Sequence, residues 1–353
     1  MRKKTTRRSE TPHVSLKSIA SEAGLSIMTV SRALRGHEDI ADETRERILK
    51  VAKGLGYRPN LLVRAIQTGQ SKNIGVIISA QKAFGSALIS GVHDALSERD
   101  YLPLVHWKNM VGYPNLTVRR HLEIDVIHRL LDRRVDGIIL LPTDESTSDA
   151  YFSEVWKRGI PLVTIDRKMR KGNFDFVGTD NTTGGRLVAR HFLELGHRRV
   201  GHISAKHIGP YAERRAAFEG ALRAGGATCT SFLADEEPNP LPAIEKFFNL
   251  KPLPTAVFLA SDYYVPVLFA SAAARGVRIP DDLSVVGYAD LHFAKYLTPA
   301  LTTVAQNPYA IGRRAATTLL QRLEPGSEGP PVDIRLTPEL VVRGSTANRA
   351  LQR

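Results

Sequence analysis

The sequence predicts a small all-α domain followed by a two-lobed α/β domain with parallel sheets. Residues 14–36 hold two short helical patterns that meet at a glycine. From residue 73 onward, short apolar runs alternate with helical patterns, and this alternation occurs in two series. The chain has 353 residues, of which 42% are hydrophobic, so it can form two or three domains with real cores.

The first two helical patterns predict a helix-turn-helix. Leu16, Ile19 and Ala20 are spaced to share one helical face. Gly24 supplies the tight turn because glycine adopts a positive φ without steric cost, and Ser26 is placed to cap the next helix, residues 27–34. In that helix the inward side is Val30, Ala33 and Leu34, and the outward side is Ile27, Met28, Ser31 and Arg32. A second helix whose N-terminal residues are free is the form that enters a DNA major groove.

A third helix over residues 42–55 is expected to pack on the first two. Asp42 lies at its N-terminus, and its predicted inward face is Ile48, Leu49, Ala52 and Leu55. Pro59 then ends the domain. Residues 61–69 could form at most two helical turns, which are marginal alone in water. We therefore expect this segment to be helical only when something such as DNA holds it.

The charge distribution agrees with a phosphate-facing first domain. Residues 1–70 carry 14 Lys and Arg against 7 Asp and Glu, which gives +7, whereas the other 283 residues carry +6 of the total +13. The alternative is that the helix pair is an ordinary solvated surface. The basic tail, residues 1–13, is expected to be disordered and to add nonspecific phosphate contacts.

Composition argues against several other classes. A single cysteine, Cys229, excludes an internal disulfide and a thiolate metal cage, and suits a reducing cytoplasm. We find no apolar region of a secretory signal, no run of about 20 apolar residues and no P-loop, GxSxG or HExxH motif. His197, His202 and His207 share no face and are interpreted as ordinary histidines. We expect a cytoplasmic, nucleoid-associated protein with no catalytic residues, metal or cofactor.

The remainder of the chain predicts two α/β lobes. The expected strands are residues 74–79, 101–105, 137–141 and 161–165 in the first series, and 200–204, 256–260 and 283–288 in the second. Helices are expected over residues 86–98 and 121–134. Open α/β sheets bind ligands at the carboxyl ends of their strands. The natural ligand site is therefore between the lobes.

Nine segments in order resemble the LacI family of bacterial transcriptional repressors over nearly the whole chain. They are the helix-turn-helix, YRPN (57–60), RRVDGIIL (133–140), GIPLVTIDR (159–167), LGHRRVGHI (195–203), PTAVFLASD (254–262), IPDDLSVVGYAD (279–290), LTPALTTV (297–304) and PELVVRGS (338–345). The resemblance implies a periplasmic-binding-protein-like effector domain whose lobes are joined by three crossing strands.

The resemblance also implies a domain organisation. The helix-turn-helix domain covers residues 14–58, a hinge helix and linker cover 59–71, and the effector domain covers 72–345. Lobe one is expected at about 72–166 plus 300–325, lobe two at about 167–290 plus 330–345, and a tail at 346–353.

In the DNA-binding module the resemblance carries over residue by residue. Ile27 and Met28 fall where relatives contact base edges, unless one of them packs into the core, and Arg32 suits guanine O6/N7. The other implied DNA-contacting residues are Leu16, Lys17, Ser26, Ser31, Thr44, Tyr57, Asn60 and Val63. Ile66 stands at a position for a minor-groove wedge. Asp39 lies near the phosphates and would be repelled unless Arg35 neutralises it.

The effector site implied by the resemblance centres on Arg214, whose fork of donors suits sugar hydroxyls or a carboxylate. The alternative for Arg214 is a solvated helix arginine. Asp166 and Asp262 follow strands and could equally be turn residues. The expected set is completed by Phe84, Ser261 and Asp290; Ala289 replaces an acid that relatives often carry.

Together these features predict a homodimeric, sequence-specific DNA-binding repressor controlled by a sugar-like effector. No leucine heptads close the chain, so a dimer is expected rather than a tetramer. The alternatives are a purine-responsive regulator or an activator of the same fold, a sugar-binding transport component, and a sugar-processing enzyme.

Overall fold

The computed structural model describes residues 14–35, 37–57, 69–79, 82–108, 115–146, 149–172, 174–206, 209–234 and 239–349. The chain divides into two compact units, residues 1–71 and 72–353, and each is described by itself. The predicted basic tail and most of the predicted hinge, including Asn60, Val63 and Ile66, lie outside the described residues.

In the first unit, the described residues form three helices around one small core. Its helices are α1 (Leu16–Ala23), α2 (Ile27–Leu34) and α3 (Asp42–Gly54). Gly24 ends α1 at φ 62°, and the Ser26 side chain accepts a hydrogen bond from the Thr29 amide at 3.0 Å to begin α2. Ile19, Val30 and Ile48 are fully buried. The core-facing prediction for Leu49 is wrong: Leu49 is half exposed, because the inward stripe of α3 passes through Ile48 and Ala52.

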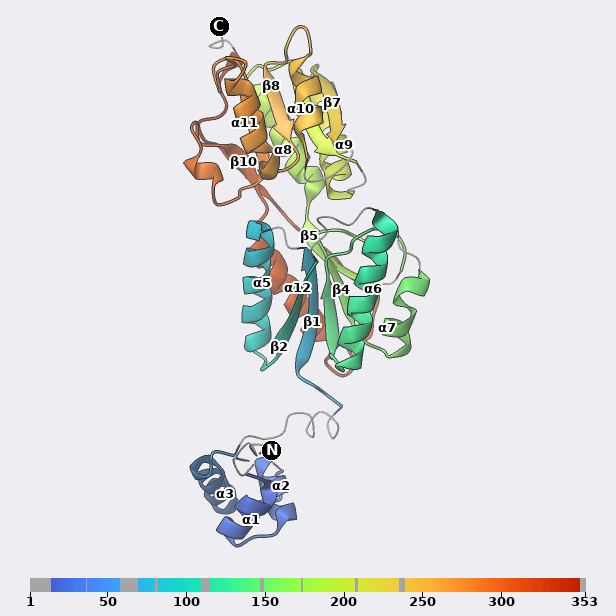
Figure 1. Cartoon of the computed structure of the whole chain (residues 1–353), viewed down its shortest axis with the longest axis vertical. Helices are drawn as coiled ribbons and strands as arrows, with labels where there is room; N and C mark the ends of the chain where they lie inside the picture. The colour runs from blue at the N-terminus through green and yellow to red at the C-terminus, as the bar shows by residue number, and fades with distance from the viewer. Residues whose placement is uncertain are drawn as a thin grey trace, which may run out of the picture. The chain divides into compact units, whose positions relative to one another are not determined.

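Lobe one of the second unit is a six-stranded parallel sheet in the order β11-β5-β4-β3-β1-β2. The strands are β1 (Asn73–Ser79), β2 (Leu102–Lys108), β3 (Gly137–Leu140), β4 (Leu162–Ile165), β5 (Asp175–Thr179) and β11 (Asp333–Leu336). One face is covered by α5 (Lys82–Ser97) and α12 (Pro308–Arg322), the other by α6 (Leu116–Asp132), the short η1 (Asp149–Phe152) and α7 (Ser153–Lys157) (Figure 1). A sheet covered on both faces explains why its strands are continuous apolar runs.

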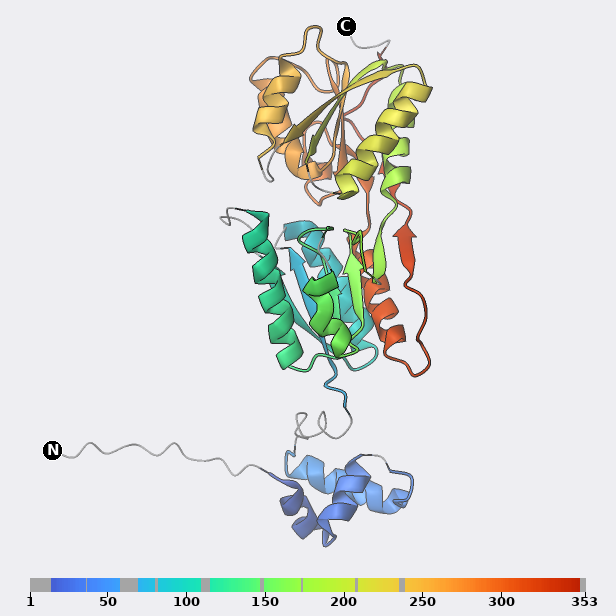
Figure 2. The same cartoon turned by 90° about the vertical axis from the view of Figure 1, so that its right-hand side faces the viewer.

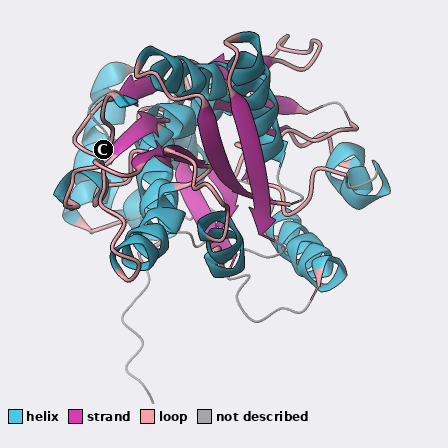
Figure 3. Cartoon of the chain, turned by 90° about the horizontal axis from the view of Figure 1, so that it is seen from above, coloured by secondary structure: helices cyan, strands magenta, loops and turns pink. Residues whose placement is uncertain are grey.

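Lobe two repeats the plan with the order β12-β10-β9-β8-β6-β7. Its strands are β6 (Arg199–Ala205), β7 (Thr228–Ala234), β8 (Ala256–Leu259), β9 (Ser284–Ala289), β10 (Thr302–Ala305) and β12 (Glu339–Val341), the last antiparallel to β10. Its helices are α8 (Asn181–Glu194), α9 (Gly209–Ala224), α10 (Leu241–Phe248) and α11 (Val265–Ala273), with 3₁₀ turns η2 (Asp262–Tyr264) and η3 (Ala294–Tyr296). Helices lie on both sides of the strands (Figure 3).

The chain crosses between the lobes three times: from β5 to α8, from β10 to α12 and from β11 to β12 (Figure 2). These crossings are hydrogen-bonded to one another. Gln306 donates from Nε2 to the Thr179 hydroxyl at 3.1 Å, and the Asp180 amide donates to the Leu336 carbonyl at 2.9 Å. The three connections therefore form one joint between the sheets.

The fold class predicted from the sequence is confirmed, and the seven expected strands agree with the structure to within three residues. The expected lobe boundaries are wrong for three segments. Strands β5 and β11 belong to lobe one, and β10 belongs to lobe two. Apolar runs mark a strand but do not reveal its neighbour; β5 joins lobe one because it pairs with β4 before the chain crosses.

The predicted tail from residue 346 is also partly wrong. The Ala347 amide donates to the Ser284 hydroxyl at 3.0 Å, and the Arg349 amide donates to the Leu195 carbonyl at 2.8 Å. Residues 346–349 thus belong to lobe two. Among the described helices, none is long and apolar enough to cross a membrane.

Candidate DNA interface and effector site

The second helix of the first unit presents the side chains that the sequence placed on its outward face. Ile27 is 49% exposed and Met28 is 65% exposed. Neither belongs to the hydrophobic cluster of this unit, so the alternative that one of them packs into the core is wrong. Leu16, in contrast, packs partly against that cluster. Of the two residues expected to contact DNA at the start of α1, the exposed Lys17 is therefore more accessible than Leu16.

Arg32, the expected base-reading arginine, forms an ion pair with Asp39. Asp39 is thus paired with Arg32 and not with Arg35, the cation considered for it from the sequence. Arg35 lies one helical turn beyond Ser31 and folds back on it, donating from Nε to the Ser31 carbonyl at 3.0 Å and from Nη2 to its hydroxyl at 2.9 Å. Because the Ser31 hydroxyl accepts this bond, its own hydrogen can still be donated to a phosphate.

The other implied phosphate-contacting residues come from several places in the first unit. Ser26 accepts from the Thr29 amide and lies 2.8 Å from the Thr29 hydroxyl. Thr44 is half-buried in the first turn of α3, and Tyr57 packs partly against the core. A helix N-terminus with capping hydroxyls favours an anion such as a phosphate.

In the second unit, Arg214 of α9 is 3% exposed, so the alternative of a solvated helix arginine is wrong. Its Nε donates to Asn181 Oδ1 at 2.7 Å, and one terminal nitrogen donates to the Ala260 carbonyl at 2.8 Å. Its guanidinium carbon lies 3.7 Å from the centroid of the Tyr288 ring. Burial raises the pKa of Tyr288 to about 12, so its hydroxyl stays protonated beside Arg214.

Contacts from Arg214 continue to the other lobe. Asn181 also donates to the Glu213 carboxylate at 3.3 Å, and that carboxylate pairs with Arg335 of lobe one at 3.2 Å. A second contact joins the lobes at the start of α9, where Glu145 of lobe one accepts from the Gly209 amide at 2.7 Å. A Cβ on Gly209 would lie 2.1 Å from Glu145 Oε2, so any other residue there would require the Glu145 carboxylate to move.

The remaining acids expected at the effector site have protein partners. Asp262 is fully buried and accepts from the Leu291 amide at 2.9 Å and the Thr303 hydroxyl at 2.8 Å. Burial raises the pKa of Asp262 to about 6. Asp290 pairs with Arg343 at 2.8 Å. The geometry favours a structural role for Asp262, which ties η2 to β10, over ligand binding.

Three further residues of the expected effector site are Ser261, Phe84 and Asp166. The Ser261 hydroxyl accepts from the Tyr263 amide at 3.4 Å and caps η2. Phe84 on α5 is half-buried and packs against the lobe-one core, so part of its ring is already covered. Asp166, at φ 60° after β4, raises the pKa of Tyr288 through its charge. The charge of Asp166, in lobe one, thus reaches the Tyr288 side chain of lobe two.

A buried polar cluster at the carboxyl ends of β2 and β3 was not predicted from the sequence. Lys108 forms an ion pair with Glu123, and both are almost inaccessible to solvent. Tyr151 donates to Glu123 at 2.8 Å, and Thr143 donates to it at 2.6 Å. The signal available in the sequence was Lys108 at the end of a strand. Its partner Glu123 is 15 residues away on a helix, and no sequence motif connects the two.

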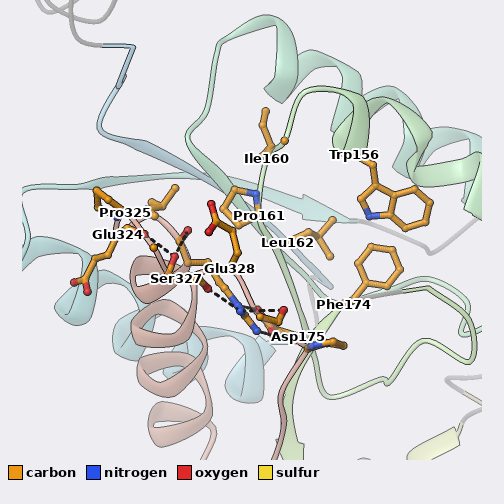
Figure 4. A pocket seen from close by; sticks show the side chains of 16 residues that line it. Trp156, Ile160, Pro161, Leu162, Phe174, Asp175, Glu324, Pro325, Ser327 and Glu328 are labelled. Carbon is orange, nitrogen blue, oxygen red and sulfur yellow. Dashed lines mark hydrogen bonds and ion pairs between the residues drawn. The ribbon is translucent and has the colours of Figure 1, made fainter.

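A cavity of about 470 Å³ lies at the opposite, amino ends of β4 and β5 (Figure 4). Trp156 and Phe174 stack on one side with ring centroids 5.3 Å apart. On the other side Asp175 pairs with Arg322 at 2.8 Å, and Arg322 also donates to the carbonyls of the 323–331 loop. Both charged groups serve to hold this loop, and none of the residues expected at the effector site lines the cavity.

The histidines of the described chain form no metal site. Among the described residues, no group of three or more His, Cys, Asp or Glu could hold a metal ion. His197 and His202 are buried, and burial lowers their pKa values to about 4 and about 3. Both side chains are therefore neutral at physiological pH. His207 lies outside the described residues.

Comparisons with known proteins match both units. Residues 15–60 match the family described as bacterial regulatory proteins, lacI family, and residues 189–346 match the periplasmic binding protein-like domain. The repressor PurR of Erwinia tasmaniensis is 30% identical over 345 residues, covering 94% of this chain and 97% of that protein. PurR of Pasteurella multocida is 28% identical over 343 residues, covering 95% and 99%.

Solved structures extend the likeness. A complex of the transcriptional regulator CelR with cellobiose is 27% identical, with a TM-score of 0.67 and coverage of 94% of this chain and 99% of that one. The lac repressor dimer bound to operator and an anti-inducer is 23% identical, with a TM-score of 0.80 and coverage of 95% and 99%, and shows the shared fold.

Proposed function

The chain belongs to the LacI family of bacterial regulatory proteins and is an effector-controlled, DNA-binding transcriptional repressor. On this basis we propose which residues contact DNA and which bind the effector. The second helix of the first unit reads operator DNA. The observation that carries this assignment is the exposed face of α2, where Ile27 and Met28 project from a capped N-terminus next to Arg32.

Each side chain of that face suits a different contact. Arg32 can donate two hydrogen bonds to guanine O6 and N7 in the major groove. Ile27 and Met28 offer apolar contact, which suits thymine methyl groups. Ser26, Ser31, Lys17, Thr44 and Tyr57 provide phosphate contacts that fix the register. In the hinge, Ile66 acts as an apolar wedge in the minor groove.

The effector site lies between the lobes around Arg214. The guanidinium is held by Asn181, Ala260 and the Tyr288 ring, and the charge of Asp166 from lobe one raises the pKa of Tyr288. A rigid fork of donors together with a carboxylate suits a polyhydroxylated ligand, which needs both donors and acceptors. The cellobiose complex of CelR supports a sugar or sugar derivative. A purine is the second candidate, because relatives named PurR cover nearly the whole chain.

Control of DNA binding follows from a shift between two arrangements of the lobes. An effector changes operator affinity only through its different affinities for those arrangements. The contacts Glu145–Gly209 and Glu213–Arg335 join the lobes and are the ones such a shift would alter. The protein acts on chromosomal DNA as a homodimer, since a two-fold protein matches a palindromic operator.

Two measurements test this proposal. Selection of bound fragments from genomic DNA should return a palindromic consensus, and Arg32→Ala should weaken binding to it by at least tenfold. Sugars, sugar phosphates and purines are then screened for a rise in melting temperature and a change in operator affinity. If no fragment is enriched, DNA reading by α2 is wrong. If no compound changes either quantity, the effector assignment is wrong.

A further inference from the structure

The side chain proposed to read a base is already occupied within the protein. Arg32 and Asp39 form an ion pair across a shallow hollow lined by Arg32, Arg35, His37, Glu38 and Asp39. The Arg32 side chain is 44% exposed and that of Asp39 is 45% exposed. His37 Nδ1 lies 4.0 Å from the same carboxylate, and Arg35 is directed to Ser31 instead. Asp39 therefore contacts Arg32 more closely than it contacts any other cation lining the hollow.

A guanidinium cannot serve two planar partners with the same donors. To form two hydrogen bonds to guanine, Arg32 must turn its terminal nitrogens toward the base edge, away from the Asp39 carboxylate. Breaking the ion pair therefore costs free energy when the operator complex forms. Because both side chains are exposed to solvent, the cost is small, a factor of about two to five in affinity.

The same carboxylate changes the effect of a wrong base. When the base offers no acceptors, an arginine without a partner in the protein loses its hydrogen bonds to water in the complex and gains none in return. With Asp39 beside it, Arg32 can return to the ion pair, and the penalty for the wrong base is limited. We propose that Asp39 is an internal competitor of DNA for Arg32 that both weakens operator binding and relaxes discrimination at the base pair that Arg32 contacts.

This inference rests on the proposed role of Arg32. Its direction is opposite to that of a simple specificity contact, because removing Asp39 should make the protein bind more tightly and also more selectively at one position. Removing a negative charge near DNA strengthens binding at every sequence. The matched control is Glu38, which lines the same hollow, has the same charge and is not paired with Arg32.

The test uses the full-length protein with Asp39→Asn, Glu38→Gln and Arg32→Ala, and the doubles that combine Arg32→Ala with each of the other two. Fluorescence anisotropy at one fixed salt concentration measures affinity for the selected operator and for operators with each base pair replaced in turn. Asp39→Asn should bind the operator about two- to fivefold more tightly than Glu38→Gln. The penalty for substitution should grow by a similar factor at one base pair in each half-site. In the Arg32→Ala background, the two variants should have equal effects.

The outcomes separate this inference from the proposed function. Equal effects of Asp39→Asn and Glu38→Gln in the presence of Arg32 would overturn the competitor role, and so would a penalty that grows equally at every base pair. If Arg32→Ala leaves discrimination unchanged at all positions, Arg32 does not read a base, and both proposals are wrong. Circular dichroism and thermal unfolding of each variant check that the domain remains folded.

Discussion

Asp262 is expected to make the effector domain less stable as pH rises. Its carboxyl is fully buried, and burial raises its pKa from 3.8 to about 6. In the unfolded chain the group ionises near its ordinary value, so between these two values the folded state binds more protons. The stabilisation from the retained proton is complete below pH 4 and is lost as pH rises through 6. A shift of about two units corresponds to about 3 kcal/mol.

The substitution Asp262→Asn isolates this effect. The amide keeps the shape of the carboxyl, since its oxygen can accept from the Leu291 amide and its nitrogen can donate to the Thr303 hydroxyl. Urea unfolding at a series of pH values from 4 to 8, followed by circular dichroism, measures the free energy of unfolding of both proteins. All other carboxyls titrate alike in the two proteins and cancel in the difference.

From pH 4 to pH 7.5, we expect the stability of the variant relative to the natural protein to rise by about 2 kcal/mol, since part of the full effect falls below pH 4. Two parallel profiles would refute the argument, because they would mean that Asp262 has the same pKa in both states. A shift of opposite sign would mean that the hydrogen bonds from Leu291 and Thr303 outweigh desolvation.

Three further predictions concern other parts of the chain. Arg214→Lys should leave operator binding within about twofold but weaken the effector response at least tenfold, because lysine cannot donate as a planar fork; a titration of effector against the operator complex measures this, and an unchanged midpoint would contradict it. Lys108→Met should lower the free energy of unfolding by about 3–5 kcal/mol by leaving Glu123 buried and unpaired; urea unfolding measures it, and a loss below about 1 kcal/mol would show that Glu123 becomes protonated or solvated. Ile66→Ala should weaken operator binding strongly while the dependence of affinity on salt stays nearly unchanged; a large fall in that slope would show that Ile66 acts through phosphate contacts.

The sequence predicted those parts of the fold that depend on local patterns. The helix-turn-helix follows from the spacing of Ile19, Val30 and their neighbours and from the caps at Gly24 and Ser26, all of which act within a few residues. Seven of the parallel strands were readable as apolar runs, whereas the buried strands β5 and β10, which carry threonines, were not predicted. Strand β11 was not predicted, because as an edge strand it alternates exposed and half-buried residues and carries charges.

The candidate site was less predictable, since its interactions join residues distant in sequence. Arg214 could be named from the resemblance, but its partners Asn181 and Ala260 are 33 and 46 residues away. Asp262 looked like a ligand acceptor at a strand end, yet the fold brings Thr303 to it from 41 residues away. The pairing of Asp39 with Arg32 instead of Arg35 depended on which way two similar side chains turn, and no sequence pattern determines that.

The joint of three crossing segments has a consequence for protein engineering. Neither lobe is a continuous stretch of chain, because β5 and β11 complete one sheet while β10 and β12 complete the other. A chimera that exchanges a whole lobe with a relative must therefore be spliced at three junctions, near residues 180, 306 and 337. A deletion of residues 333–353 would remove β11 and β12 together, and each sheet would lose an edge strand at once.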